Sequence, residues 1–196
     1  MIDDVARWHG FAALLPPAEA REFRDCWDIG EQEAGLGLLV AALLEHRVPI
    51  GGTTRAEIAV TAEEWGVREA VEPGLGRLPY AEGGRRGDDA LRLVDPADGL
   101  PLPGPAGSAG SAGPSGPSDG AGALLVVPWI VCTRCGRTLA RAHEREPWGD
   151  LSYLARHYAL FAPGRSAPER SFADGAAWEA LTALRVSCGG GGGGGR

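Results

Sequence analysis

Two cysteines in the second half of the chain stand at the spacing that suits one metal ion or one dithiol. They are Cys132 and Cys135, in the segment Cys-Thr-Arg-Cys-Gly-Arg. A turn of this length points both sulfurs at one centre, and Gly136 supplies the left-handed backbone conformation that ends such a turn. The pair predicts a structural Zn²⁺ site, with two reduced thiols and no metal, or a redox-active dithiol, as the alternatives.

A tetrahedral zinc site needs two more ligands, and the sequence contains no second CxxC. One histidine follows the CxxC by eight residues and another lies farther along, so the predicted metal ligands are Cys132, Cys135, His143 and His157. Ligands from a partner chain are the alternative. Cys188 is a poorer candidate, because a run of glycines follows it and the tail 187–196 is expected to be unstructured.

The redox interpretation is disfavoured by the residues after the CxxC. In thioredoxin-like proteins this motif opens a helix that follows a strand, and Gly136-Arg137-Thr138 is a poor start for a helix.

A second group of chemically active side chains lies near the N-terminus. It is an acidic cluster of Asp25, Asp28, Glu31 and Glu33. Because no histidine or glycine-rich loop accompanies these carboxylates, catalysis is disfavoured; the alternatives are a face that binds a basic partner protein and ordinary charge at a helix start.

Composition excludes several classes of enzyme. All 19 cationic residues are arginine, so the chain has no Schiff-base lysine and no P-loop lysine. The motif HExxH is also absent, and GxGxxG does not occur outside the glycine run at 189–195. The sequence therefore predicts a protein that is not an enzyme.

The elements that must position these residues fall into two parts. Residues 1–70 show helical periodicity broken by Pro16-Pro17, Gly30 and Pro49, which predicts an acidic domain of four helices. Residues 76–186 predict a small module of antiparallel strands and helices built on the CxxC knuckle. Its strands are expected at 91–94, 124–131 and 138–142, and its helices at 150–161 and after Asp174.

The module contains a stretch of unusual composition at residues 96–122. Proline, glycine, serine and alanine make up most of it, so it cannot bury enough surface to order itself and is expected to be disordered. Apolar strands flank it closely, which favours an insertion at the tip of a hairpin. The expected fold class is thus α+β.

Charge and hydropathy restrict the classes of partner and the cellular compartment that we expect. Residues 1–70 carry 13 acidic residues and 6 arginines, a net charge of −7, whereas residues 123–196 carry 6 acidic residues and 9 arginines, a net charge of +3. The acidic part makes nucleic acid an unexpected partner. No apolar run reaches the ~20 residues of a membrane span, and no signal peptide is recognisable, so we expect a cytoplasmic protein without membrane contact.

The segment from Phe23 to Leu39, followed by Leu43-Leu44-Glu45 and Val48-Pro49-Ile50, resembles the Maf-type immunity family of bacterial toxin systems. The resemblance covers about residues 20–66. It implies a small helical protein that binds and neutralises a cognate toxin, with acidic residues such as Asp25 and Asp28 facing a basic toxin surface.

These observations together predict a protein-binding protein, with an immunity protein as its specific form. The first alternative is a zinc-stabilised adaptor or regulatory module that binds protein or nucleic acid. The second is a CxxC thiol oxidoreductase. The oligomeric state stays open.

Overall fold

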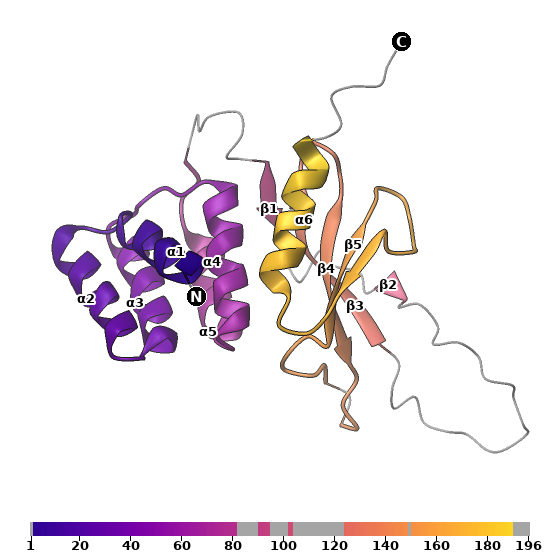
Figure 1. The fold of residues 1–196 in the computed structure, drawn as a ribbon, viewed down its shortest axis with the longest axis horizontal. Coiled ribbons are helices and arrows are strands. Elements are labelled where there is room, and N and C mark those ends of the chain that lie inside the picture. The colour runs from indigo at the N-terminus through magenta and orange to yellow at the C-terminus, as the bar shows by residue number, and fades with distance from the viewer. Residues whose placement is uncertain (1, 82–89, 95–101, 104–123, 149, 190–196) are drawn as a thin grey trace, which may run out of the picture. The chain divides into compact units, whose positions relative to one another are not determined.

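The protein has an α+β fold, as expected. The computed structural model describes residues 2–81, 90–94, 102–103, 124–148 and 150–189, which hold six helices and six strands (Figure 1). The chain divides into two compact units, Met1–Leu91 and Arg92–Arg196. The predicted disordered stretch 96–122 lies outside the described residues, except for residues 102–103, and so does the glycine tail from residue 190.

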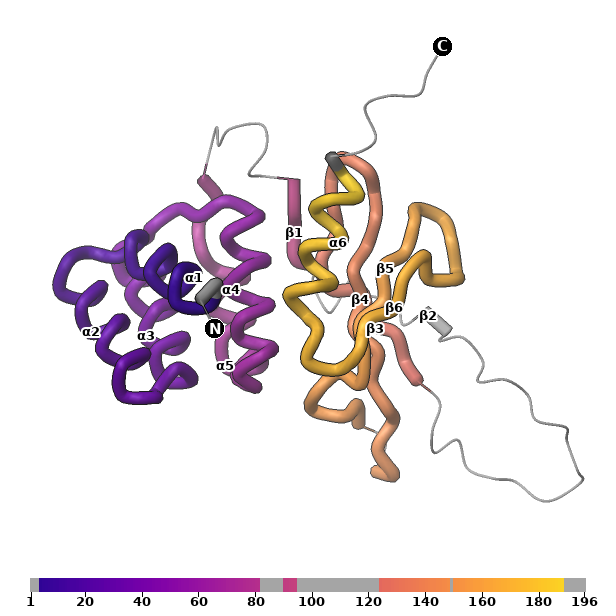
Figure 2. The backbone as a smooth tube through the Cα atoms, viewed as in Figure 1, coloured from indigo at the N-terminus to yellow at the C-terminus, as the bar shows by residue number. Residues whose placement is uncertain are grey.

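The first unit contains five helices, one more than the four that the sequence predicts (Figure 2). They are α1 (Ile2–Ala12), α2 (Pro17–Asp28), α3 (Gln32–Glu45), α4 (Gly52–Glu64) and α5 (Arg68–Arg77). The helix that the sequence analysis missed is α5, because it contains Pro73 and two glycines, which ordinarily disfavour a helix interior. Packing overrides this preference: a Cβ atom at Gly74 would lie 2.4 Å from a methyl group of Val40 on α3, so only glycine permits the contact.

Aromatic packing fixes the core of this unit. The ring of Trp8 stacks on Phe23 at 4.0 Å between centroids, and its indole N–H donates to the Phe23 carbonyl oxygen at 2.9 Å. A Cβ atom at Gly35 would lie 2.7 Å from the Trp8 ring. The absence of a side chain at Gly35 therefore lets α3 approach α1 closely.

A buried arginine joins α4 to the end of α5. Arg55 is 1% exposed, and its guanidinium donates to the carbonyl oxygens of Leu75, Leu78 and Pro79, the last two at 3.1 and 3.3 Å. It also lies 4.1 Å from the centre of the Tyr80 ring. Because carbonyl groups at a helix C-terminus carry partial negative charge, they favour this cation. Burial nevertheless lowers the pKa of Arg55.

The second unit is built on an antiparallel sheet. Its strands are β1 (Leu91–Leu93), β2 (Leu102–Pro103), β3 (Leu124–Cys132), β4 (Thr138–Glu144), β5 (His157–Phe161) and β6 (Arg170–Phe172). The order is β1-β3-β4-β5-β6, and β2 also pairs with β3. A register shift between Pro128 and Ile130 marks a bulge, which is one of the sites where a strand tolerates proline.

The predicted helix at 150–161 is wrong. Leu151 forms an isolated bridge with Arg145, and residues 157–161 form β5, whose residues pair with β4 from Thr138 to Ala142. Leu151 and Leu154, which the helix would have buried, are 41% and 54% exposed. The helical spacing of the apolar residues was coincidental, and pairing with β4 decides the structure of this segment.

The second unit ends in α6 (Ala177–Gly189), which packs against β3, β4, β5 and β6. Its buried residues include Leu181 and Leu184, as the pattern after Asp174 predicts. The helix continues through Cys188, so the expectation that residues 187–189 are unstructured is wrong. Within the residues that the structure describes, no helix is long and apolar enough to cross a membrane.

Candidate metal centre

The CxxC forms the turn between the two longest strands. Cys132 is the last residue of β3, and β4 begins at Thr138. The Cys132 N–H donates to the Arg137 carbonyl oxygen at 2.9 Å, and the Gly136 N–H donates to the Cys132 carbonyl oxygen at 2.8 Å. Gly136 has φ of +69°, a conformation that favours glycine. Two backbone hydrogen bonds and one glycine therefore fix the positions of both cysteines.

A third cysteine reaches this turn from α6. The sulfur of Cys188 lies 2.9 Å from the sulfur of Cys135 and 2.9 Å from that of Cys132. All three sulfurs lie within 4.8 Å of one another. Cys132 is fully buried at 0% exposure, whereas Cys135 and Cys188 are half-buried. The three side chains thus converge on one small volume that is accessible from the side of Cys135 and Cys188.

The sulfur–sulfur distances lie between those of a disulfide and those of a metal thiolate site. Zinc–sulfur bonds of ~2.3 Å in a tetrahedron place the sulfurs about 3.8 Å apart. The two contacts at 2.9 Å are shorter than this value and longer than a disulfide bond of ~2.05 Å, and all the cysteines are free thiols. A modest separation of the sulfurs would accommodate an ion. Three thiolates are a soft donor set, which suits Zn²⁺ and Cu⁺ rather than Mg²⁺ or Ca²⁺.

The structure does not bring the two predicted histidine ligands to the cysteines. His143 pairs with Leu125 and lies five residues beyond the start of β4, about 17 Å along the strand from Thr138. Its Nδ1–H donates to the Ser152 carbonyl oxygen at 2.8 Å, so the ring is oriented within the β4–β5 connection. His157 pairs with Ala142, also at the far end of β4. The third candidate ligand beside Cys132 and Cys135 is therefore Cys188, and neither His143 nor His157 lies in the cluster.

Cys188 carried a signal that the sequence analysis did not use. In α6 it follows Leu181 by seven residues and Leu184 by four, so it continues the apolar stripe that packs the helix on the sheet. Reading this stripe to its end would have placed Cys188 on the buried face of the helix.

An arginine and a glutamate lie next to the sulfurs. Arg137 donates through Nε to Glu169 at 2.9 Å, and its side chain also hydrogen-bonds to the sulfur of Cys135. Its pKa is raised, first by the hydrogen bond to Glu169 and then by the one to Cys135. Neither Arg137 nor Glu169 was singled out from the sequence.

The pKa values of Cys135 and Cys188 are shifted in opposite directions. Burial raises the pKa of Cys135, but hydrogen bonds from Cys188, the Arg137 backbone, Cys132 and the Arg137 side chain outweigh it, so the pKa lies below that of an ordinary thiol. Burial and the two neighbouring sulfurs raise the pKa of Cys188. Cys135 therefore loses its proton before Cys188 does. A bound cation would favour the thiolate form of all three.

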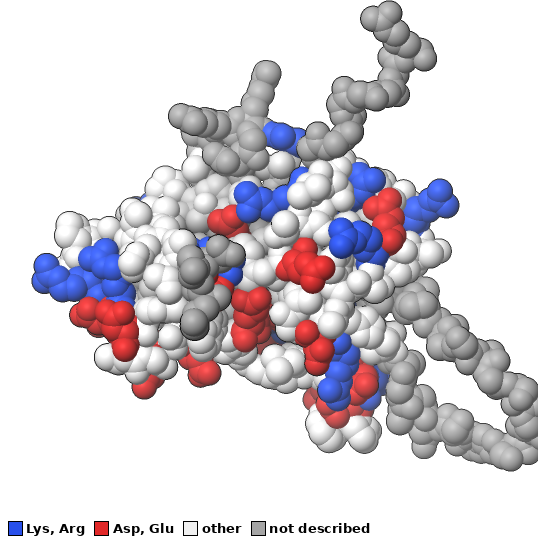
Figure 3. All heavy atoms as spheres, viewed as in Figure 1, with Lys and Arg blue, Asp and Glu red and all other residues white. Residues whose placement is uncertain are grey.

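The acidic cluster lies on the surface of the first unit. Asp25 and Asp28 end α2, Glu31 and Glu33 begin α3, and all four side chains are exposed. Ile29, between them, is 71% exposed. Figure 3 shows acidic side chains over the helices on the face in view.

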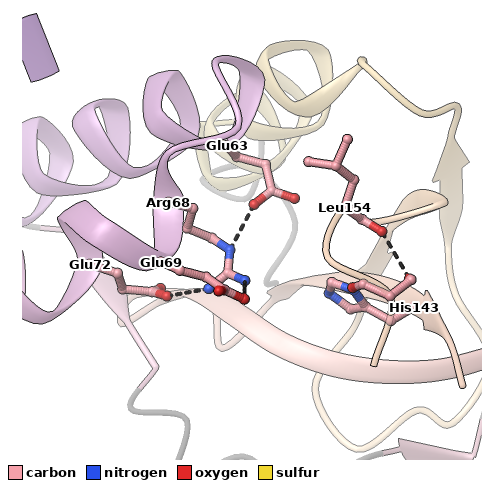
Figure 4. A network of polar contacts seen from close by, with 7 residues as sticks. Glu63, Arg68, Glu69, Glu72, His143 and Leu154 are labelled. Atoms are coloured by element: carbon pink, nitrogen blue, oxygen red, sulfur yellow. Dashed lines mark hydrogen bonds and ion pairs between the residues drawn. The ribbon is translucent and has the colours of Figure 1, made fainter. Parts of the chain in front are cut away.

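A separate ion-pair network links α4 to α5 (Figure 4). Arg68 lies 2.9 Å from Glu63 and 2.6 Å from Glu72, and 3.5 Å from Glu69. Because the Glu63 side chain is only 2% exposed, this arginine supplies the charge that its burial requires. The network joins two helices and is structural.

Comparison of the chain with protein-family models, with curated proteins and with solved structures gives no match. The chemistry of the cysteine cluster therefore follows from its geometry and from its donor atoms.

Proposed function

We propose that this chain is a non-enzymatic binding protein whose second unit is stabilised by one Zn²⁺ ion bound to Cys132, Cys135 and Cys188. The observation that carries the proposal is the convergence of three sulfurs, from a turn and from a helix, within 4.8 Å. Among the described residues no other cysteine, histidine or carboxylate belongs to this group. A water molecule or a donor atom from a partner completes the tetrahedron.

A structural role fits the position of the site. The cluster joins the β3–β4 turn to α6 through cysteines that are 53 and 56 residues apart in the sequence. A unit with few residues has a small core, and a metal that links its distant segments adds folding free energy directly. A bound ion would thus add to the hydrophobic contacts that already pack α6 on the sheet.

Metal analysis of the purified full-length chain tests the proposal. We expect one Zn²⁺ per chain, lost when Cys188 is replaced by alanine and retained when Cys26 is replaced. Cys26 is the matched control because it is a buried cysteine of the first unit. Substitution of Co²⁺ should give the absorption bands of a tetrahedral thiolate site. A purified chain that is folded, fully reduced and free of metal after refolding with excess Zn²⁺ would refute the zinc proposal.

A second function, binding of a basic protein, is favoured by the exposed carboxylates around Ile29. An apolar side chain surrounded by acidic residues has the composition of a small interface, with charge that steers association and an apolar centre that contributes affinity. In the specific form of this proposal, the partner is a toxin and the chain is its immunity protein.

Co-expression with the product of the adjacent gene tests this second function. Reversal of Asp25 and Asp28 to arginine should abolish co-purification, whereas reversal of Glu179, an exposed residue of α6, should not. Equal loss with both variants would refute the acidic face as the binding surface. Salt-sensitive retention of the wild-type chain on DNA would instead favour the alternative of a nucleic-acid-binding adaptor.

A further inference from the structure

We propose that the same cluster is an oxidation site, where peroxide joins Cys135 to Cys188 in a disulfide and releases the metal. The release of metal rests on the proposed zinc site, whereas formation of the disulfide does not.

The distances favour a bond to Cys188. Its sulfur is in contact with the other two, and closing the 2.9 Å separation from Cys135 to a disulfide requires a movement of about 0.9 Å. Both residues are free thiols, and Cys188 lies in the last turn of α6. The geometry therefore needs only a local adjustment of two side chains.

Burial selects Cys135 over Cys132 as the partner. Cys132 is 0% exposed, whereas Cys135 and Cys188 are half-buried and reachable by a small polar oxidant. Since a thiol must meet the oxidant before it can react, the two accessible sulfurs are oxidised and Cys132 stays a thiol.

The reaction balances with one peroxide molecule. The sulfur of Cys135 attacks one peroxide oxygen, the O–O bond breaks, and the leaving hydroxide takes a proton to give water, which leaves a sulfenic acid. The sulfur of Cys188 then attacks this sulfur, the S–O bond breaks, and a second water leaves with the remaining proton. Two cysteines are oxidised by two electrons in total, and hydrogen peroxide is reduced to two molecules of water.

The disulfide removes metal ligands but keeps a covalent link between the β3–β4 turn and α6. Oxidation removes two of the three sulfur donors, and a single thiolate at Cys132 cannot retain Zn²⁺. The disulfide nevertheless links the β3–β4 turn to α6, as the metal did. The oxidised second unit thus loses its ion and stays folded.

Treatment of the zinc-loaded full-length chain with hydrogen peroxide tests the inference. We expect loss of two thiols per chain, release of one Zn²⁺ detected with a metallochromic indicator, and a peptide map with a Cys135–Cys188 bond. Dithiothreitol and added Zn²⁺ should restore the starting state. A Cys132–Cys135 bond, or oxidation of Cys135 to sulfinic acid with no disulfide, would overturn the inference.

Two variants and a metal-free arm complete the experiment. Cys188→Ala should abolish the disulfide, whereas Cys26→Ala should react as the wild type does. The same treatment is applied to the chain after removal of metal with a chelator. A Cys135–Cys188 bond in a chain that never bound zinc would refute the proposed zinc site and support the oxidation site. Zinc binding without a Cys135–Cys188 bond in either arm would support the zinc site and refute the oxidation site.

Discussion

Replacement of Arg55 by alanine should destabilise the first unit more than any surface substitution. The variant removes the donors that serve the carbonyl oxygens of Leu75, Leu78 and Pro79, and leaves a cavity under the Tyr80 ring. A hydrogen bond from a charged group contributes about 1.5–3 kcal/mol, and the long contact to Pro79 at 3.3 Å counts least. Burial of the cation opposes these gains.

These effects give an expected loss of about 4 kcal/mol in the free energy of unfolding, within the ~3–5 kcal/mol typical of a broken buried charge contact. Arg55→Lys keeps the charge but has one ammonium group in place of the planar fork, so it should lose about half as much. The lowered pKa of Arg55 means that burial disfavours its cation. Because a guanidinium nevertheless stays protonated in proteins, no proton is exchanged between pH 5 and 9, and the loss should not vary with pH in that range.

Urea unfolding followed by circular dichroism at 222 nm measures this loss, and peptide-resolved hydrogen exchange locates it. The amide groups of residues 68–77 should lose most of their protection. Arg24→Ala, at an exposed position of α2, is the matched control and should change stability by less than about 0.5 kcal/mol. The reasoning fails if Arg55→Ala costs no more than Arg24→Ala, or if Arg55→Lys is as stable as the wild type.

Three further predictions follow from packing, from the metal and from acidity. Gly35→Ala should lower the free energy of unfolding by about 1–3 kcal/mol, because its Cβ would lie 2.7 Å from the Trp8 ring. Gly37→Ala should raise the free energy of unfolding slightly, because a Cβ there has nothing within 4 Å. Urea unfolding of both variants measures the two changes. A chelator should lower the melting temperature of the wild type but not that of Cys188→Ala. Where free zinc is at a thousandfold excess over its dissociation constant, removing it should lower the free energy of unfolding of the wild type by about 4 kcal/mol. Scanning calorimetry measures both melting temperatures, and equal shifts for the two proteins would contradict the prediction. Burial, and after it the negative charges of Glu22, Glu31 and Asp25, raises the pKa of Cys26. Less of its thiolate is therefore present at pH 8, and iodoacetamide should label Cys26 more slowly than a free thiol at that pH. Labelling at the rate of a free thiol would disprove this prediction.

Local patterns were sufficient to predict much of the fold. The helical spacing of apolar residues predicted α1 to α4 and α6, and the apolar runs around the CxxC predicted β3 and β4. These elements form where the pattern of burial agrees with the intrinsic preference of the residues. The bulge near Pro128 has a different local cause, since proline has no N–H to donate to the sheet.

Long-range packing decided the rest. Pro73 argued against α5, but the helix packs on α3 and α4 through the buried residues Val71, Gly74 and Leu75. The segment 150–161 has apolar residues at helical spacing, yet its hydrogen-bond partners are on β4. Neither contact is encoded by neighbours in the sequence.

The candidate site was half predictable for a related reason. Cys132 and Cys135 are separated by two residues, so their convergence follows from a local turn. Cys188 reaches them only because α6 packs across the sheet, which is a property of the folded unit. The histidines were chosen for their nearness in sequence, and the strand carries them away from the turn.

The position of Cys188 also sets an order of assembly. It follows Cys135 by 53 residues, and β5, β6 and nearly all of α6 lie between them. During synthesis, the CxxC turn can hold an ion with only two thiolates until the helix has left the ribosome and docked on the sheet. Under the proposed function, tight retention of zinc would mark the completion of the second unit, and a chain arrested before residue 188 would give up its ion to any competing chelator.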